Sequence, residues 1–193
     1  MKINNSCLDL VFLTSAASYS QCPNFSENEI VFVGASNAGK SSAINALSNK
    51  KKLAKVSKTP GKTKLFNFFK SKAGLIVDMP GYGYSKVSKI QKKDWSKEIP
   101  LYFERRVNLV HVLIFTDARQ PMRESDIRMV EMLEKLNIPY SIILTKSDKL
   151  TLDEKKKTIL NLESIFAYSM LISTKDQASI VKLRSYISEL LSS

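Results

Sequence analysis

The segment 34–41 constrains this chain more than any other feature of its sequence. It reads Gly-Ala-Ser-Asn-Ala-Gly-Lys-Ser and matches the pattern G-x-x-x-x-G-K-[S/T]. Residues 29–33, which precede it, are rich in β-branched and aromatic side chains, as in a buried strand. A helix should begin near Lys40, so the pattern lies between a strand and a helix. This context predicts a loop that wraps around phosphate groups.

The chemistry of a phosphate loop explains each residue type in the pattern. Gly34 and Gly39 let the backbone approach the phosphates closely, while amide groups and the helix N-terminus point at negative charge. Lys40 can reach the β and γ phosphates, and the Ser41 hydroxyl can bind magnesium. The alternative, a flexible glycine turn with a chance lysine, does not explain the flanking strand and helix. The loop alone does not separate ATP from GTP.

A second motif, Asp78-Met-Pro-Gly81, stands at the end of another apolar strand. A carboxylate there can meet magnesium through water, and the Gly81 amide can face the γ phosphate. Taken alone, Asp-x-Pro-Gly is equally typical of a plain turn. Its place after a strand, downstream of the phosphate loop, favours the nucleotide interpretation.

A third motif, Thr145-Lys-Ser-Asp148, again follows a strand. Asp148 can accept hydrogen bonds from the ring N–H and the exocyclic amine of guanine, and the Lys146 stem can lie over the base. Adenine does not offer that pair of donors. The three motifs in this order therefore predict GTP as the nucleotide and disfavour an ATP-dependent small-molecule kinase, for which we also find no acceptor-site base.

Apolar strands alternate with amphipathic helical patterns along the chain, which is typical of parallel strands joined by crossover helices. The expected strands cover residues 29–33, 109–115, 140–144 and 168–172. Helical patterns follow at Ile127, Val130, Leu133 and Leu136, over 152–165, and at Ile180, Leu183, Ile187 and Leu190. Residues 64–69 and 75–78 instead indicate a hairpin and thus one antiparallel edge strand. We predict a mostly parallel, three-layer α/β/α fold.

Composition bounds the organisation of the chain. With 193 residues, 44% of them apolar and 25% charged, we expect one globular domain over residues 1–193. No apolar run approaches the roughly 20 residues that cross a bilayer, and the first residues do not resemble a signal peptide. We therefore expect a cytoplasmic protein with no membrane partner. Arg105 and Arg106 are expected to face solvent.

The net charge of +12 is concentrated in one quarter of the chain. Between Lys50 and Lys97 there are 14 lysines and only two acidic residues, Asp78 and Asp94, whereas elsewhere 16 basic residues balance 16 acidic ones. A solvated lysine face explains many such runs. Binding to a phosphate backbone explains them too. Trp95, within this run, is either part of the core or able to stack on an RNA base.

With these motifs the chain resembles the EngB/YihA (YsxC) family of bacterial ribosome-biogenesis GTP-binding proteins, in the TRAFAC class with Era and TrmE. The resemblance covers nearly the full length. It rests on the phosphate loop with Asn37 and the Ser41-Ser42 pair, on Thr59-Pro-Gly-Lys-Thr63, on Asp78-Met-Pro-Gly-Tyr-Gly-Tyr84, on Asp117-Ala-Arg with Pro121 and Asp126, and on Thr145-Lys-Ser-Asp148.

The resemblance implies a P-loop GTPase that assists assembly of the large ribosomal subunit and is needed for normal cell division and septation. It implies a lead-in over residues 1–28, a switch I segment over 50–64 and a switch II segment over 78–97. Thr63 would bind magnesium when GTP is bound, and Asn37 resembles an asparagine that binds potassium in related GTPases. Ribosomal RNA would contact the basic region, and the protein would be a monomer.

The complete set of expected GTP-binding residues joins all of these segments. It comprises Gly34, Ala35, Ser36, Asn37, Ala38, Gly39, Lys40, Ser41, Ser42, Gly61, Lys62, Thr63, Lys64, Leu65, Asp78, Met79, Pro80, Gly81, Thr145, Lys146, Ser147, Asp148, Ile172, Ser173 and Thr174. The expected metal-binding residues are Ser41 and Thr63 for magnesium, Asp78 through water, and Asn37 for potassium. Lys40, Thr63 and Gly81 belong to this phosphate and magnesium site, and no separate catalytic residue is assigned.

Some residues depart from the family pattern. Ala35 stands where arginine is usual, the segment 171–173 is Leu-Ile-Ser rather than Phe-Ser-Ser, and Ala178 replaces a common glycine. Tyr82 follows Gly81 near the place where Ras-like switches carry a water-positioning glutamine. GTP hydrolysis should therefore be slow unless a cation, backbone geometry or a partner assists it. An alternative function is a GTP-stabilised RNA-binding scaffold with negligible turnover.

Overall fold

The computed structural model describes residues 8–54, 65–82 and 89–192, with side chains from residue 97 onward in the last range. The strands are β1 Val11–Ala16, β2 Glu29–Gly34, β3 Phe66–Lys70, β4 Leu75–Asp78, β5 Leu109–Asp117, β6 Tyr140–Thr145 and β7 Ser169–Leu171. The helices are α1 Lys40–Leu47, α2 Lys89–Arg105, α3 Glu124–Lys135, α4 Leu152–Glu163 and α5 Gln177–Ser192, with short 3-10 turns at Tyr19–Gln21 and Ser147–Lys149.

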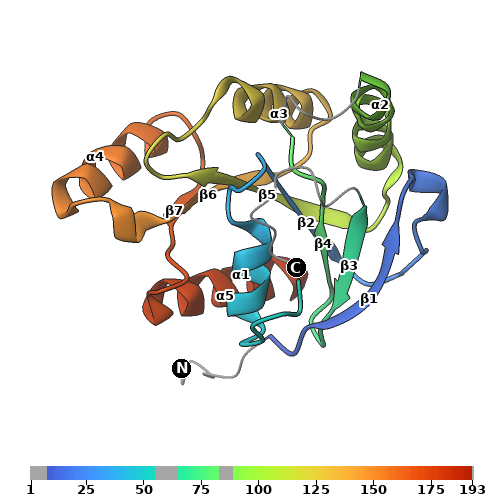
Figure 1. The fold of residues 1–193 in the computed structure, drawn as a ribbon, viewed down its shortest axis with the longest axis horizontal. Helices are drawn as coiled ribbons and strands as arrows, with labels where there is room; N and C mark the ends of the chain where they lie inside the picture. The colour runs from blue at the N-terminus through green and yellow to red at the C-terminus, as the bar shows by residue number, and fades with distance from the viewer. Residues whose placement is uncertain (1–7, 55–64, 83–88, 193) are drawn as a thin grey trace.

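Within the described residues the strands form one seven-stranded sheet in the order β1-β3-β4-β2-β5-β6-β7. Helices α1 and α5 cover one face of this sheet, and α2, α3 and α4 cover the other (Figure 1). The predicted three-layer, mostly parallel fold is confirmed. None of the helices in the described part of the chain is long and apolar enough to span a membrane.

The central strand β2 is buried along its whole length because helices cover both faces of the sheet around it. Its side chains alternate between the two layers. Val31 and Val33 join the core under α2 and α3, whereas Ile30 and Phe32 join the core under α1 and α5. Strands β4, β2, β5 and β6 run parallel to one another. Their carboxyl ends therefore lie along the same edge of the sheet.

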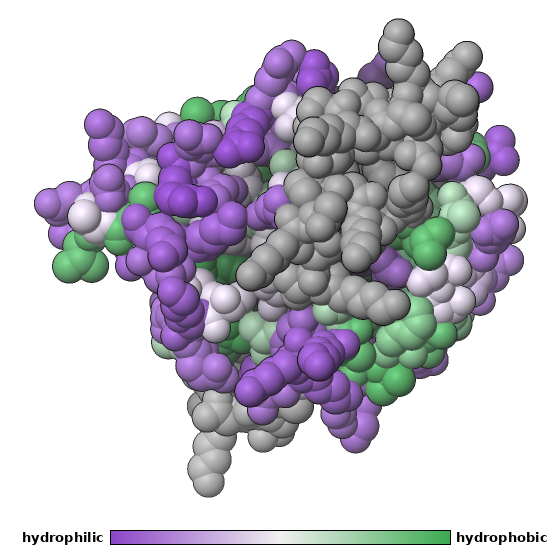
Figure 2. All heavy atoms as spheres, in the orientation of Figure 1, coloured by the Kyte–Doolittle hydropathy of each residue, from purple (hydrophilic) through white to green (hydrophobic). Residues whose placement is uncertain are grey.

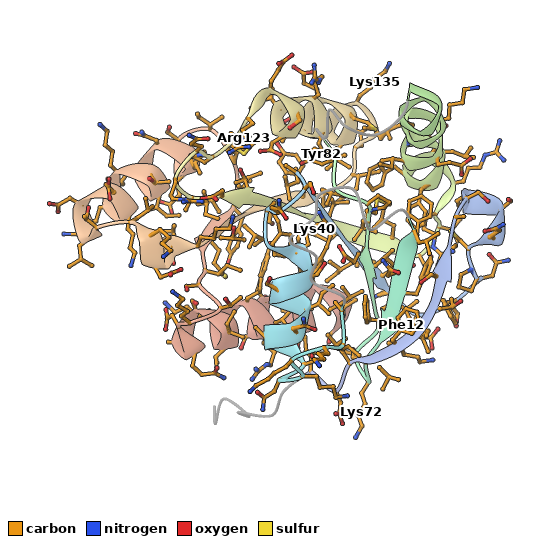
Figure 3. The ribbon with its side chains drawn as sticks, in the orientation of Figure 1. Phe12, Lys40, Lys72, Tyr82, Arg123 and Lys135 are labelled. Atoms are coloured by element: carbon orange, nitrogen blue, oxygen red, sulfur yellow. The ribbon has the colours of Figure 1, made fainter. Side chains whose placement is uncertain are left out.

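Strand β3 runs antiparallel to β4, as the predicted hairpin required. The structure adds a strand that the sequence analysis did not expect, because β1 pairs with the other side of β3 and occupies the outer edge. Three consecutive apolar residues of β1, Val11, Phe12 and Leu13, are 55%, 45% and 38% exposed. Figure 3 labels Phe12 on β1, at the side of the molecule where Figure 2 shows hydrophobic atoms on the surface. A run of exposed apolar residues gives no alternating strand pattern.

One further expectation needs correction. Arg106 does not face solvent but is 7% exposed, because its guanidinium donates hydrogen bonds from Nε and Nη2 to the buried Glu29 carboxylate, at 3.0 and 2.7 Å to Oε2. At the end of α5, Leu191 is buried beside the predicted core-facing residues of this helix. Leu190 is partly buried and packs against the same core.

Candidate functional site

The chain passes from β2 into α1 through residues 35–39, at the edge where the parallel strands end. Gly34 adopts φ +151°, and a Cβ on it would lie 2.3 Å from the carbonyl oxygen of Phe115 in β5. Gly39 adopts φ +102°, a region that side chains rarely allow. Both glycines of the pattern are therefore required by the backbone, as a tightly wrapped phosphate loop demands.

Lys40 opens α1 with its side chain turned back into this loop (Figure 3). The side chain is buried, and Nζ donates a hydrogen bond to the Gly34 carbonyl oxygen at 2.8 Å. Burial lowers the pKa of Lys40, while Asp78 and then Asp126 oppose that shift. An ammonium held this way is stabilised further by any anion that enters the loop, since burial makes the charge costly without one.

Ser41 and Asp78 meet beside Lys40. The Ser41 Oγ donates to Asp78 Oδ2 at 2.9 Å, and the Asp78 Oδ1 is buried without a hydrogen-bond partner among the described residues. Burial raises the pKa of Asp78, which Lys40 and Ser41 partly counteract. A hydroxyl and a carboxylate with an unused oxygen are the ligand types that magnesium prefers. The residues at this position therefore fit a magnesium ion.

The segment after Asp78 packs directly on the phosphate loop. The Ser36 N–H donates to the Tyr82 carbonyl oxygen at 3.2 Å, and a Cβ on Gly81 would lie 2.8 Å from the Ser36 Cα. Burial raises the pKa of the Tyr82 hydroxyl, and the nearby Asp126 carboxylate adds to this shift. Figure 3 shows Tyr82 at the same end of the sheet as Lys40. A change in the phosphate groups bound by the loop can therefore alter the position of Gly81 and Tyr82.

On the other side of the loop, the end of β6 holds the loop in place. Thr145 Oγ1 donates to the Ala38 carbonyl oxygen at 2.7 Å and lies 3.1 Å from the Thr116 carbonyl oxygen. Lys146 Nζ donates to the Asn37 carbonyl oxygen at 2.9 Å. The predicted base-binding segment and the phosphate loop are therefore joined by side-chain contacts, as one nucleotide spanning both would require.

The structure brings the last predicted segment onto Asp148. Ser173 Oγ donates to Asp148 Oδ1 at 2.9 Å, and Lys175 Nζ lies 3.1 Å from Oδ2. Contact with Lys175, and then with Ser173, lowers the pKa of Asp148. The Asp148 side chain remains 25% exposed, so its carboxylate can exchange the Lys175 contact for an incoming donor. Ile172 and Ser173 are buried, whereas Thr174 is exposed.

The remaining predicted residues differ in burial, and some of them lie outside the described residues. Met79 and Pro80 are buried between Asp78 and Gly81, and Ser42 lies in the first turn of α1. Leu65, just before β3, is 37% exposed. The described residues do not include Gly61, Lys62, Thr63 and Lys64 of the predicted set, nor Gly83 and Tyr84. The side chain of Trp95 also lies outside the described part of the chain.

Asp117 and Arg119 lie at the edge of this site, although their sequence pattern predicted no role for them there. Asp117 ends β5 and pairs in register with Thr145 of β6. Its carboxylate contacts Arg119 and also Lys146 Nζ, at 2.9 Å. The available signal was the position of Asp117 two residues after the predicted parallel strand 109–115, one predicted strand before the Thr-Lys-Ser-Asp segment.

Comparisons with known proteins agree with this geometry. A family model described as "50S ribosome-binding GTPase" matches residues 29–146. A probable GTP-binding protein EngB of Chlorobium phaeobacteroides is 42% identical over 187 residues, which cover 93% of this chain and 97% of that protein. The corresponding protein of Clostridium beijerinckii is 48% identical over 147 residues, covering 76% and 74%.

Solved structures share the fold. The crystal structure of a probable GTP-binding protein EngB superposes with a TM-score of 0.65 at 22% identity, over 84% of this chain and 98% of that one. Era, solved with MgGDPNP and nucleotides of 16S ribosomal RNA, gives a TM-score of 0.69 at 21% identity, over 85% of this chain and 56% of that one.

A mostly parallel sheet lies between two layers of helices, and a phosphate loop, a serine–aspartate pair and a Thr-Lys-x-Asp segment lie along one of its edges. This combination defines a P-loop GTP-binding protein. The family model covers more than half of the chain, and a relative matched over 97% of its own length is 42% identical. The chain belongs to the EngB family of GTP-binding proteins. It is a GTPase of the switch type, and GTPases of this kind use magnesium with GTP.

Proposed function

We propose that this GTPase is a GTP-gated assembly factor for the large ribosomal subunit. By family resemblance, it also supports cell division and septation. One observation carries the proposal: the whole excess of positive charge lies between Lys50 and Lys97, a region that includes both proposed switch segments. The family description "50S ribosome-binding GTPase" supports the choice of subunit. We place the protein in the cytoplasm, as a single-domain monomer.

We assign the nucleotide contacts from the site geometry and the motifs together. The loop amides and Lys40 bind the phosphates, Ser41 and Asp78 hold magnesium, and Asp148 binds guanine beside Ser173. Magnesium bound there would neutralise phosphate charge. We also assign Thr63 to magnesium and Asn37 to potassium, on the resemblance alone.

The gate, in this proposal, is the contact between Gly81–Tyr82 and the loop at Ser36. A γ phosphate facing the Gly81 amide would fix the chain that leads into the basic part of switch II, over residues 78–97. After hydrolysis that constraint is lost, and so is the arrangement of lysines that RNA binds. The Tyr82 side chain has no amide group that could orient a water molecule, unlike the glutamine of Ras-like switches. This supports slow GTP hydrolysis in the absence of a cation or partner.

The test is sedimentation of the protein with large-subunit precursors, bound either to GDP or to the analogue GDPNP, over a series of salt concentrations. RNA binding through lysines predicts affinity that falls steeply with salt. The variant Lys51→Glu/Lys52→Glu changes two exposed lysines of the basic region and should weaken binding. Lys156→Glu/Lys157→Glu, on the exposed surface of α4, is the matched control. Equal effects of both variants, or no salt dependence, would contradict the RNA contact.

A second candidate, a GTP-stabilised RNA-binding scaffold, keeps the same basic surface but needs no turnover. Single-turnover GTP hydrolysis, measured with and without potassium and with and without ribosomal particles, separates the two. A switch should hydrolyse GTP faster in the presence of its particle. A scaffold should show no acceleration under any of these conditions.

A further inference from the structure

We propose that Asp117 is a positioning residue for nucleotide binding, which acts by holding the Lys146 ammonium between the phosphate loop and the base-binding segment. Arg119 supports it by fixing the orientation of the carboxylate. The proposal depends on GTP binding by this family and does not depend on the ribosomal role.

Arg119 locks the Asp117 carboxylate on one side. Its Nε donates to Oδ1 at 3.0 Å and its Nη2 to Oδ2 at 2.7 Å, while the Arg119 backbone N–H donates to Oδ1 at 3.1 Å. A two-point contact between a guanidinium and a carboxylate restricts rotation of both groups. The Asp117 side chain is only 12% exposed, so little water competes for it.

Lys146 joins three segments through one nitrogen. Its Nζ donates to Asp117 Oδ2 at 2.9 Å, at the end of β5, and to the Asn37 carbonyl oxygen at 2.9 Å, in the phosphate loop. Lys146 itself belongs to the segment that leads to Asp148, and its backbone has φ +58°. The ammonium thus ties the loop that takes the phosphates to the segment that takes the base.

This arrangement explains why a carboxylate is needed at Asp117. The Lys146 side chain is 35% exposed, so without a fixed anion its ammonium could turn into solvent or toward Asp148. Movement into solvent would withdraw the lysine stem from the base. Movement toward Asp148 would occupy the carboxylate that guanine needs. A neutral turn residue would satisfy the backbone N–H of Arg119 but would not hold the ammonium.

The experiment measures the dissociation rate of the fluorescent nucleotide mant-GDP from the full chain by stopped flow. Asp117→Ala should raise the rate about tenfold, which corresponds to the loss of one partly exposed charge-assisted hydrogen bond. Lys146→Met should raise it by a similar or larger factor. In the double variant the effects should not multiply, because both changes remove the same contact.

Asp117→Asn keeps an acceptor for the Arg119 N–H and should raise the rate about threefold. It tests the proposal even if Asp117→Ala does not fold. Glu124→Ala removes another carboxylate–arginine pair, with Arg128 on the exposed surface of α3, and should leave the rate unchanged. The proposal is overturned if Asp117→Asn, with a native circular dichroism spectrum, releases mant-GDP at the wild-type rate. Multiplying effects in the double variant would also overturn it, because Asp117 would then act independently of Lys146.

Discussion

Ser41 in the first turn of α1 donates a hydrogen bond to Asp78 at the end of β4, over 2.9 Å between Oγ and Oδ2. This contact joins the phosphate loop to the start of the proposed switch II segment. Both groups are ligand types for magnesium, and Asp78 retains a buried oxygen with no partner in the described part of the chain. Release of magnesium and movement of the segment after Asp78 should therefore be coupled.

The first prediction concerns this pair. Ser41→Ala removes the hydroxyl that would bind magnesium, so the GTP affinity measured with magnesium should fall about tenfold or more. The affinity measured with excess chelator should change little. Titration calorimetry under both conditions checks this, with the exposed Ser185→Ala on α5 as the control. An equal loss with and without magnesium would show that Ser41 serves the loop and not the ion.

Asp148→Asn should exchange guanine for xanthine as the preferred base. The amide presents a donor where guanine also presents a donor, so GTP affinity should fall about 100-fold, whereas XTP should bind better than it does to the wild type. Competition against mant-GDP measures both. Asp153→Asn, on the exposed start of α4, is the control. Unchanged GTP affinity in Asp148→Asn would show that the base binds elsewhere.

Gly81→Ala tests the contact between the proposed switch II segment and the phosphate loop. The backbone at Gly81 is not left-handed, but an added Cβ would lie 2.8 Å from the Ser36 Cα. Overpacking of this kind costs about 1–3 kcal/mol, so the segment should move away from the loop. GDPNP affinity should then fall about tenfold more than GDP affinity. A parallel loss for both nucleotides would mean that Gly81 does not sense the γ phosphate.

His111 should make the protein sensitive to acid. It is buried in β5, Nε2 lies 2.8 Å from Ser141 Oγ, and burial lowers its pKa from 6.5 to about 4. The folded state therefore binds fewer protons than the unfolded state, so the stabilisation is present above pH 6.5 and is lost as pH falls toward 4. Allowing for partial solvent access, the loss is about 2 kcal/mol. Urea unfolding at pH 7 and pH 4.5 should show a smaller drop for His111→Gln than for the wild type.

Much of this fold follows from patterns within single segments. The runs before Gly34, Asp78 and Thr145 are apolar enough to be recognised as buried strands, and each carries its motif at the carboxyl end. Because parallel strands end at one edge, the motifs had to converge there. Ser173, in a segment that departs from the family pattern, donates a hydrogen bond to Asp148, so it lies beside the residue proposed to bind guanine.

The features that were missed depend on how distant segments pair. Strand β1 shows no alternation, since Val11, Phe12 and Leu13 are all exposed and its register shifts between Phe12 and Thr14. The Asp117–Lys146 contact requires the pairing of Asp117 with Thr145, which no local pattern determines. Arg106 was expected in solvent because its buried partner, Glu29, lies 77 residues away in the chain.

One ratio decides whether bound GTP controls binding to the large ribosomal subunit. This is the Kd for large-subunit precursors with GDP divided by the Kd with GDPNP, at fixed ionic strength. We expect a ratio of about 10 or more, which corresponds to a coupling free energy of about 1–3 kcal/mol between two sites. A ratio of one, with both nucleotides shown to be bound, would contradict it.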